Sequence, residues 1–170
     1  GPTNSVEDII MKSSNVGTIR MALAAGTSAQ KKTLKDLGFF DAVPVELGEA
    51  GRTKPQIPKN WSDTSTITIS FGHGISATPL HLATAYSIVA NGGYRVKPTI
   101  KKINIENLTK EKVISPKTSQ QLISMLRRVV SEVDGTAKMA KVDGYEVAEK
   151  TGTAEKIKPT GGYYDKKVIA

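Results

Sequence analysis

The hydrophobic positions in the first part of the chain predict three short helices. Ser5 is followed three positions later by an acidic residue, which is the spacing of a capping box, and predicts a helix that runs to about Lys12. Residues 16–25 place apolar side chains at helical spacing and stop at Gly26, which predicts a helix buried on one face. Residues 29–37 predict a third helix.

Two longer helices are predicted further along the chain. Residues 78–90 begin with Thr-Pro, are apolar on all sides and end at the Asn-Gly-Gly of 91–93, which is typical of a central, buried helix. Residues 115–130 begin with Ser-Pro and place Leu, Ile and Val on one face. Residues 39–70 are rich in Pro, Gly, Lys and Asp, so we expect mostly loop there, with at best one short strand at 43–47.

The C-terminal part of the sequence predicts strands. Alternating apolar and polar positions favour a strand over residues 145–153, and residues 168–170 have the character of the start of a neighbouring strand. A strand with only a partial neighbour does not form a stable sheet and exposes its edges. We therefore expect the residues after about Lys141 to be poorly ordered or to pair with another chain.

Composition excludes several classes of function. The 170 residues contain no cysteine, which rules out disulfides and thiolate zinc sites, and no apolar run is long enough to span a membrane. The formal charge of +8 comes from lysines spread among acids, with few aromatic residues, so we expect a solvated basic surface and no nucleic-acid partner. A basic face also suits anionic envelope polymers or lipid headgroups. Gly1-Pro2 has the form of the scar that a cleaved expression tag leaves.

Two short motifs carry the candidate chemistry. Ser13-Ser14-Asn15 falls at a helix–helix junction, and Lys150-Thr151-Gly152 lies at the end of the predicted strand. Each motif alone is weak, because Ser13 and Asn15 can simply cap the next helix, and Lys150 can be a surface lysine. The two histidines lack the additional ligands that a metal site needs, and the glycine-rich segments lack the spacing of phosphate or dinucleotide loops.

The order of motifs along the chain strengthens their interpretation. The sequence contains KSSNVG at 12–17, SFGHG at 70–74, TPLHLA at 78–83, NGG at 91–93 and KTGTA at 150–154. This series resembles the transpeptidase domain of class B penicillin-binding proteins, most closely the division-type enzymes. The resemblance implies an α+β fold over an incomplete domain at residues 3–170. That fold is a partial serine β-lactamase/transpeptidase-like fold, consisting of the helical lobe and the strand that carries Lys-Thr-Gly, with most of the antiparallel sheet missing.

The resemblance also implies the roles of six residues. Ser13 relays a proton toward the leaving nitrogen, Asn15 holds the substrate's amide, and Lys150 places a cation in the cleft. Thr151 and Thr153 hydrogen-bond the substrate carboxylate, and Gly152 lets the strand approach the ligand; these three are the substrate-binding residues. The backbone N–H of Thr153 supplies half of an oxyanion hole. No metal or other cofactor is implied.

The family's nucleophile is expected in a Ser-x-x-Lys element that precedes the Ser-x-Asn motif, and no such element precedes Ser13 in this sequence. Ser28-Ala29-Gln30-Lys31 matches Ser-x-x-Lys but follows the Ser-x-Asn motif, whereas the family's element precedes it, and Ser28 is expected to cap a helix. The chain by itself is therefore predicted to be inactive. Two further departures, His81 where the family often has Gln and Glu149 before Lys-Thr-Gly, involve positions that do no chemistry in the family.

The implied function is a peptidoglycan D,D-transpeptidase of septal wall synthesis that β-lactams acylate. Its expected partners are the D-Ala-D-Ala stem peptide, β-lactam antibiotics and membrane proteins of the division complex, including the septal glycan polymerase. Its expected location is the bacterial inner membrane, through an upstream single-pass anchor, with the catalytic domain in the periplasm. A D,D-carboxypeptidase or β-lactamase, and a non-catalytic penicillin-binding-like sensor or scaffold, stay open as alternatives.

Overall fold

A computed structural model describes residues 4–158, 160 and 163–169 of the chain. Its α-helices, within those residues, are α1 (Val6–Met11), α2 (Asn15–Ala25), α3 (Thr27–Asp36), α4 (Asp63–Ser70), α5 (Pro79–Ala90) and α6 (Pro116–Ser131). The strands are β1 (Tyr94–Val96), β2 (Lys110–Lys112), β3 (Thr153–Ile157) and β4 (Tyr163–Ile169), and short 3-10 turns lie at Ala50–Arg52, Ile105–Asn107 and Lys138–Ala140. Gly1-Pro2, the expected tag scar, lies outside the described residues.

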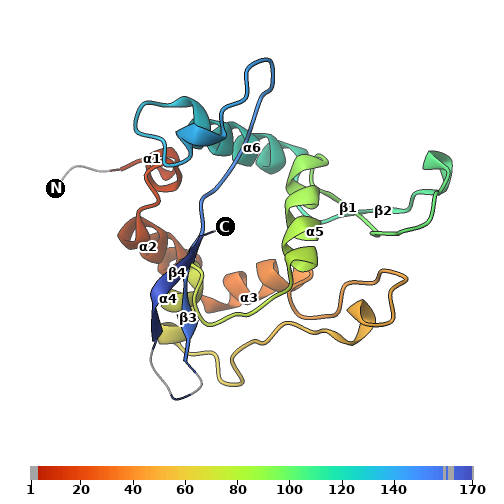
Figure 1. Ribbon diagram of the computed structural model, residues 1–170, viewed down its shortest axis with the longest axis horizontal. Helices are drawn as coiled ribbons and strands as arrows, with labels where there is room; N and C mark the ends of the chain where they lie inside the picture. The colour runs from red at the N-terminus through yellow and green to blue at the C-terminus, as the bar shows by residue number, and fades with distance from the viewer. Residues whose placement is uncertain (1–3, 159, 161–162, 170) are drawn as a thin grey trace.

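The helices follow one another in an arc, each packed on the next (Figure 1). Helix α5 contacts α6, α6 contacts α1, α1 contacts α2, and α2 contacts both α3 and α4. Strands β1 and β2 form an antiparallel pair that extends from the end of α5 away from the helices. This mixture of helices with small antiparallel sheets confirms the α+β class expected from the sequence.

The packing between α1 and α6 brings the segment after α1 and the segment before β3 together. Val129, Val130 and Ala137 form a buried cluster at the end of α6. Ile10 of α1 and Val147 both pack against this cluster. The loop after α1 and the segment before β3 are therefore held on the same part of the core, although they are far apart in sequence.

Capping chemistry explains the helices that the sequence predicted correctly. The Ser5 hydroxyl accepts from the N–H of Asp8 at 3.1 Å, and the Asp8 carboxylate accepts from the N–H of Ser5, which completes the predicted capping box. Thr78 caps α5 and Ser115 caps α6, each directly before a proline at the first helical position. The third helix, α3, is confirmed, but its N-cap is Gly26, so the expected capping role of Ser28 is wrong.

Two predictions about the long loop were wrong. Helix α4 lies where loop was expected, because Ser62 and Ser65 form a reciprocal cap that starts a helix. Its interior alternates threonine and isoleucine, a composition more typical of strands, so tertiary packing on α2 decides the conformation. No strand forms at residues 43–47; Val43 is buried as a single side chain within irregular backbone.

The C-terminal strands also differ from expectation. Residues 145–152 are irregular because they are tied to α6, with the Glu149 N–H donating to the Leu126 carbonyl at 3.3 Å, and the strand begins only at Thr153. Strand β4 begins at Tyr163, earlier than expected, and pairs antiparallel with β3, with Thr153 opposite Ile169. The sequence led us to expect disorder or pairing with another chain, whereas the partner strand of β3 belongs to the same chain.

Burial of two helices is less complete than their sequences predicted. Helix α2 leaves Val16 63% exposed and Leu23 48% exposed, so its apolar stripe is not covered by the described residues. Helix α5 buries His81, Ala85 and Ile88 but leaves Leu82 47% exposed, so it is buried on one face only. Among the described residues, every helix is too short or too polar to cross a bilayer.

Candidate active site

Ser13 lies in the turn between α1 and α2, and its side chain is free of any capping role. The helix cap is the neighbouring Ser14, whose hydroxyl accepts from the Gly17 N–H at 3.2 Å. The alternative in which Ser13 caps the helix is therefore wrong. Ser13 has φ of 51°, a left-handed conformation that costs an L-residue about 1 kcal/mol. Gly17 allows this tight turn, because a Cβ there would lie 2.5 Å from the Ile9 side chain.

Lys150, in the segment before β3, is hydrogen-bonded to Ser13. Its ammonium nitrogen donates to the Ser13 hydroxyl at 2.6 Å and to the Thr151 carbonyl at 3.0 Å. Neither acceptor is charged, and no ion pair joins Lys150 to an acid among the described residues. Partial burial of the ammonium group lowers the pKa of Lys150 from its ordinary value. A lysine that has a lowered pKa and is hydrogen-bonded to a serine hydroxyl can exchange a proton with that hydroxyl.

A second hydroxyl, that of Thr136, completes the cluster and was not found from the sequence. Thr136 Oγ1 lies 3.5 Å from Ser13 Oγ and 3.2 Å from Thr151 Oγ1, so it connects the two motifs. Gly135 places it there, because a Cβ on Gly135 would lie 2.2 Å from the Val129 carbonyl oxygen of α6. The sequence signal was a glycine just after a long helix, which indicates a turn but says nothing of the hydroxyl beside it.

The other candidate residues lie near this cluster without joining its hydrogen bonds. Asn15 is the first residue of α2 and is exposed, and Thr153 is the exposed first residue of β3. Neither side chain makes a hydrogen bond to any residue that the structure describes. Gly152 is exposed between the two threonines. The structure therefore brings Ser13, Lys150 and Thr151 together and leaves the side chains of Asn15 and Thr153 available to a ligand.

The histidines have structural surroundings. His81 Nδ1 lies 2.7 Å from the Thr78 hydroxyl, and its Nε2 lies 2.9 Å from the Asp41 carbonyl oxygen, so both ring nitrogens are occupied. His73 packs against the ring of Phe71. In the part of the chain that the structure describes, no three His, Asp or Glu side chains gather into a group that could hold a metal ion.

The lowered pKa of Lys150 predicts a pH-dependent stability. Between the folded-state pKa and the ordinary value of 10.5, the unfolded chain binds the proton more strongly than the folded chain does. We therefore expect the free energy of unfolding to rise with pH through this alkaline window, relative to a Lys150→Met variant. Denaturant unfolding of both proteins at several pH values above 7 measures the difference. Parallel curves, or a difference that falls as pH rises, would contradict it.

The position of Thr136 between Ser13 and Thr151 predicts that loss of its hydroxyl slows the reaction of the site moderately. A Thr136→Val change in the whole protein keeps the shape of the side chain and removes its hydroxyl, so we expect the acyl-transfer reaction that the motifs imply to slow by up to about tenfold, the worth of one neutral hydrogen bond. Thr136→Ser, which restores the hydroxyl, should recover most of the rate. Equal losses in both variants would mean that packing of the threonine methyl group matters and the hydroxyl does not.

Comparison with known proteins identifies the family to which this site belongs. All residues from 1 to 170 match the family described as the penicillin binding protein transpeptidase domain. The chain belongs to this family, which confirms the resemblance seen in the motifs.

Several relatives are similar over most of the chain. It is 40% identical to penicillin-binding protein PbpB of Mycolicibacterium smegmatis, over 91% of this chain and 26% of that protein. It is 35% identical to the peptidoglycan D,D-transpeptidase FtsI of Escherichia coli, over 93% of this chain and 26% of that protein. The chain thus spans about a quarter of the length of these curated relatives.

Solved structures of related proteins share the fold. The apo transpeptidase domain of Burkholderia pseudomallei penicillin-binding protein 3 matches with a TM-score of 0.88 at 33% identity, over 97% of this chain and 50% of that one. Penicillin-binding protein 3 of Mycobacterium tuberculosis, complexed with ampicillin, matches with a TM-score of 0.82 at 32% identity, over 95% of this chain and 39% of that one. The chain therefore has the fold of part of a transpeptidase domain, as the sequence predicted.

Proposed function

We propose that this chain forms one side of the acyl-transfer site of a peptidoglycan D,D-transpeptidase. The observation that carries the proposal is the 2.6 Å hydrogen bond from Lys150 to Ser13, which joins the two motifs across 137 positions of sequence. Taking an ammonium group partly out of water costs free energy, and the turn that holds the Ser13 hydroxyl is strained. A purely structural role for Lys150 does not explain why this contact forms.

The proposed reaction needs a nucleophilic serine from a Ser-x-x-Lys element, which does not precede Ser13 in this sequence. That serine oxygen bonds to the carbonyl carbon of the penultimate D-Ala, and its proton passes to the base. When the peptide C–N bond breaks, the Ser13 hydroxyl gives its proton to the leaving nitrogen, and Lys150 returns a proton to Ser13. An amine of a second stem peptide then attacks the acyl carbonyl carbon, and the ester C–O bond to the serine breaks. The proton that the amine loses goes to Lys150, and the proton held by the base returns to the serine oxygen.

The remaining candidates bind the substrate in this proposal. Asn15 presents a carboxamide whose two ends can donate to and accept from a peptide backbone. The hydroxyls of Thr151 and Thr153 donate hydrogen bonds to the terminal carboxylate of the substrate, and the positive charge of Lys150 attracts that carboxylate. Gly152 carries no side chain, so a ligand can approach the strand closely. The Thr153 N–H forms half of an oxyanion hole, which stabilises the charge that develops on the carbonyl oxygen.

The cellular setting is part of the same proposal. The similarity to FtsI and PbpB supports peptidoglycan cross-linking, and penicillin-binding protein 3 of Mycobacterium tuberculosis has been solved in complex with ampicillin and with aztreonam. We infer that β-lactams bind this site and that the substrate is a D-Ala-D-Ala stem peptide. We also propose that the whole protein acts at the septum with membrane proteins of the division complex, including the glycan polymerase. It is held in the inner membrane by an anchor, and its catalytic domain lies in the periplasm.

Intact mass spectrometry of the whole protein after brief exposure to a penicillin tests the proposal. One penicilloyl group per molecule is expected, together with release of D-Ala from a stem peptide when an acceptor amine is present. Release of D-Ala with water as the only acceptor would indicate a carboxypeptidase. No adduct on a folded whole protein would favour a non-catalytic sensor or scaffold.

The chain alone provides the matched control. Residues 1–170 lack a Ser-x-x-Lys element before Ser13, so no penicilloyl group should form on them. Ser28, the first serine of the one Ser-x-x-Lys sequence present, lies within the first turn of α3. A stoichiometric adduct on Ser28 would overturn the assignment of the nucleophile.

A further inference from the structure

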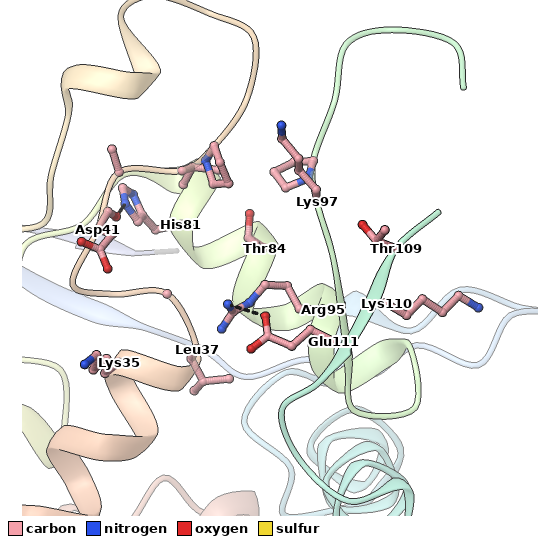
Figure 2. Close-up of a pocket in the computed structure, with 15 residues that line it drawn as sticks. Lys35, Leu37, Asp41, His81, Thr84, Arg95, Lys97, Thr109, Lys110 and Glu111 are labelled. Atoms are coloured by element: carbon pink, nitrogen blue, oxygen red, sulfur yellow. Dashed lines mark hydrogen bonds and ion pairs between the residues drawn. The ribbon is translucent and has the colours of Figure 1, made fainter. Parts of the chain in front are cut away.

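A cavity of about 500 Å³ lies between the body of the protein and the base of the β1–β2 pair, and it shares no residue with the candidate active site (Figure 2). One wall comes from the end of α3 and the loop that follows it, including Leu37 and Pro44. Helix α5 contributes His81 and Thr84, and the opposite wall comes from β1, β2 and the residues next to them: Arg95, Lys97, Pro98, Thr109, Lys110 and Glu111. The volume lies within the usual range for ligand pockets.

Two sets of polar contacts hold the walls at their separation. On one side, Arg95 donates to the Asp36 carbonyl of α3 and to the Glu111 carboxylate at 3.0 Å, so it ties both strands to the body. On the other side, the Glu46 carboxylate accepts from the Thr99 hydroxyl at 2.9 Å and from the Ile100 N–H at 3.2 Å. These hydrogen bonds lower the pKa of Glu46, so the second contact persists over the physiological pH range.

The charges around the cavity are unbalanced. Lys35, Lys97 and Lys110 line it, and none of them forms an ion pair within the described part of the chain. Of the two lining carboxylates, Glu111 is already paired with Arg95, which leaves Asp41 as the only acid to offset three exposed lysines. The cavity therefore attracts an anionic ligand.

Its walls are also apolar enough to select among anions. Leu37, Pro44 and Pro98 line the cavity together with the lysines. Beyond it, the loop between β1 and β2 exposes Ile100 by 63% and Ile105 by 80%. A simple polyanion makes no apolar contact with such side chains. An extended peptide alternates its side chains, so it can present acids to the lysines and apolar groups to these residues.

We propose that this cavity is a docking groove for an extended, acidic segment of a partner protein, with aliphatic or proline side chains between its acids. The exposed isoleucines of the β1–β2 loop continue the apolar contact beyond the groove. His81 takes no part through its ring nitrogens, because both are occupied. The groove is separate from Ser13 and Lys150, so the proposal goes beyond the acyl-transfer function and stands independently of it.

Fluorescence anisotropy with a labelled eight-residue peptide, Glu-Leu-Glu-Pro-Glu-Leu-Glu-Pro, tests the proposal on the whole protein. Saturable binding that weakens as salt is raised is expected. A Lys35→Glu/Lys97→Glu double variant should bind about tenfold more weakly, because both rim charges become repulsive. The matched control is Lys117→Glu, an exposed lysine in the first turn of α6 that does not line the cavity, and it should bind as the parent does.

Several results would overturn the proposal. These are no saturable binding of the acidic peptide, equal loss of binding in Lys117→Glu, and equal binding of a peptide with lysine in place of every glutamate. Equal binding of an all-glutamate peptide would show a charge effect without a groove, and preferential binding of phosphatidylglycerol vesicles would assign the surface to lipid. The thermal unfolding midpoint of the double variant should equal that of the parent, which shows that weaker binding does not result from unfolding.

Discussion

A Lys150→Ala change in the whole protein is expected to slow acylation by a penicillin at least about a hundredfold, the lower end of the range for removing a general acid–base group. The Lys150 ammonium is the donor in the shortest contact of the candidate site, 2.6 Å to the Ser13 hydroxyl. Without it, Ser13 loses the group that can restore its proton after the leaving nitrogen has taken one. Pre-steady-state measurement of the acylation rate constant gives the effect directly.

The control for Lys150 is a lysine of the same segment that lacks the contact. Lys141 is exposed, and its side chain makes no hydrogen bond within the described residues, so Lys141→Ala removes the same charge without touching Ser13. Its acylation rate should stay within about twofold of the parent's, because an exposed charge that makes no contact with Ser13 is screened by salt. Equal slowing in both variants would show that net charge attracts the anionic penicillin and that Lys150 has no special role.

The helices could be predicted from the sequence where local chemistry decides them. Ser5, Thr78 and Ser115 each begin a helix with a side-chain cap, and their signals lie within four residues of the helix start. Helix α4 and the segment 145–152 could not be predicted in this way. Helix α4 has a local cap at Ser62 and Ser65, but its threonine–isoleucine interior favours a strand, so packing against α2 decides its conformation. The conformation of the segment depends on its long-range contact with α6.

The candidate site shows the same division between local and long-range information. The two motifs were visible in sequence, and their meeting at Ser13 and Lys150 followed from resemblance to a family. The sequence analysis considered Ser13 and Asn15 as caps of α2, because both residue types can cap a helix, whereas the cap in the structure is Ser14. Thr136 was missed because its place between the motifs depends on Gly135 packing against the carbonyl of Val129, which is a tertiary contact.

The adjacent serines of the motif are expected to separate function from stability. Ser13→Ala removes the hydroxyl that Lys150 contacts and should slow acylation at least about a hundredfold, with little change in thermal unfolding. Ser14→Ala removes the cap of α2 and should lower the free energy of unfolding by about 1 kcal/mol, with acylation of the folded protein nearly intact. Acylation kinetics and denaturant unfolding of both variants give the comparison.

A third variant at the same turn tests why Ser13 has its unusual backbone. With φ of 51°, Ser13 holds a left-handed conformation that glycine adopts without steric cost. Ser13→Gly should therefore be more stable than Ser13→Ala by about 1 kcal/mol and equally slow in acylation. A serine kept at a position where glycine folds better indicates that the hydroxyl is retained for its chemistry. If Ser13→Gly is less stable than Ser13→Ala, the turn is not strained, and the serine is explained by local structure alone.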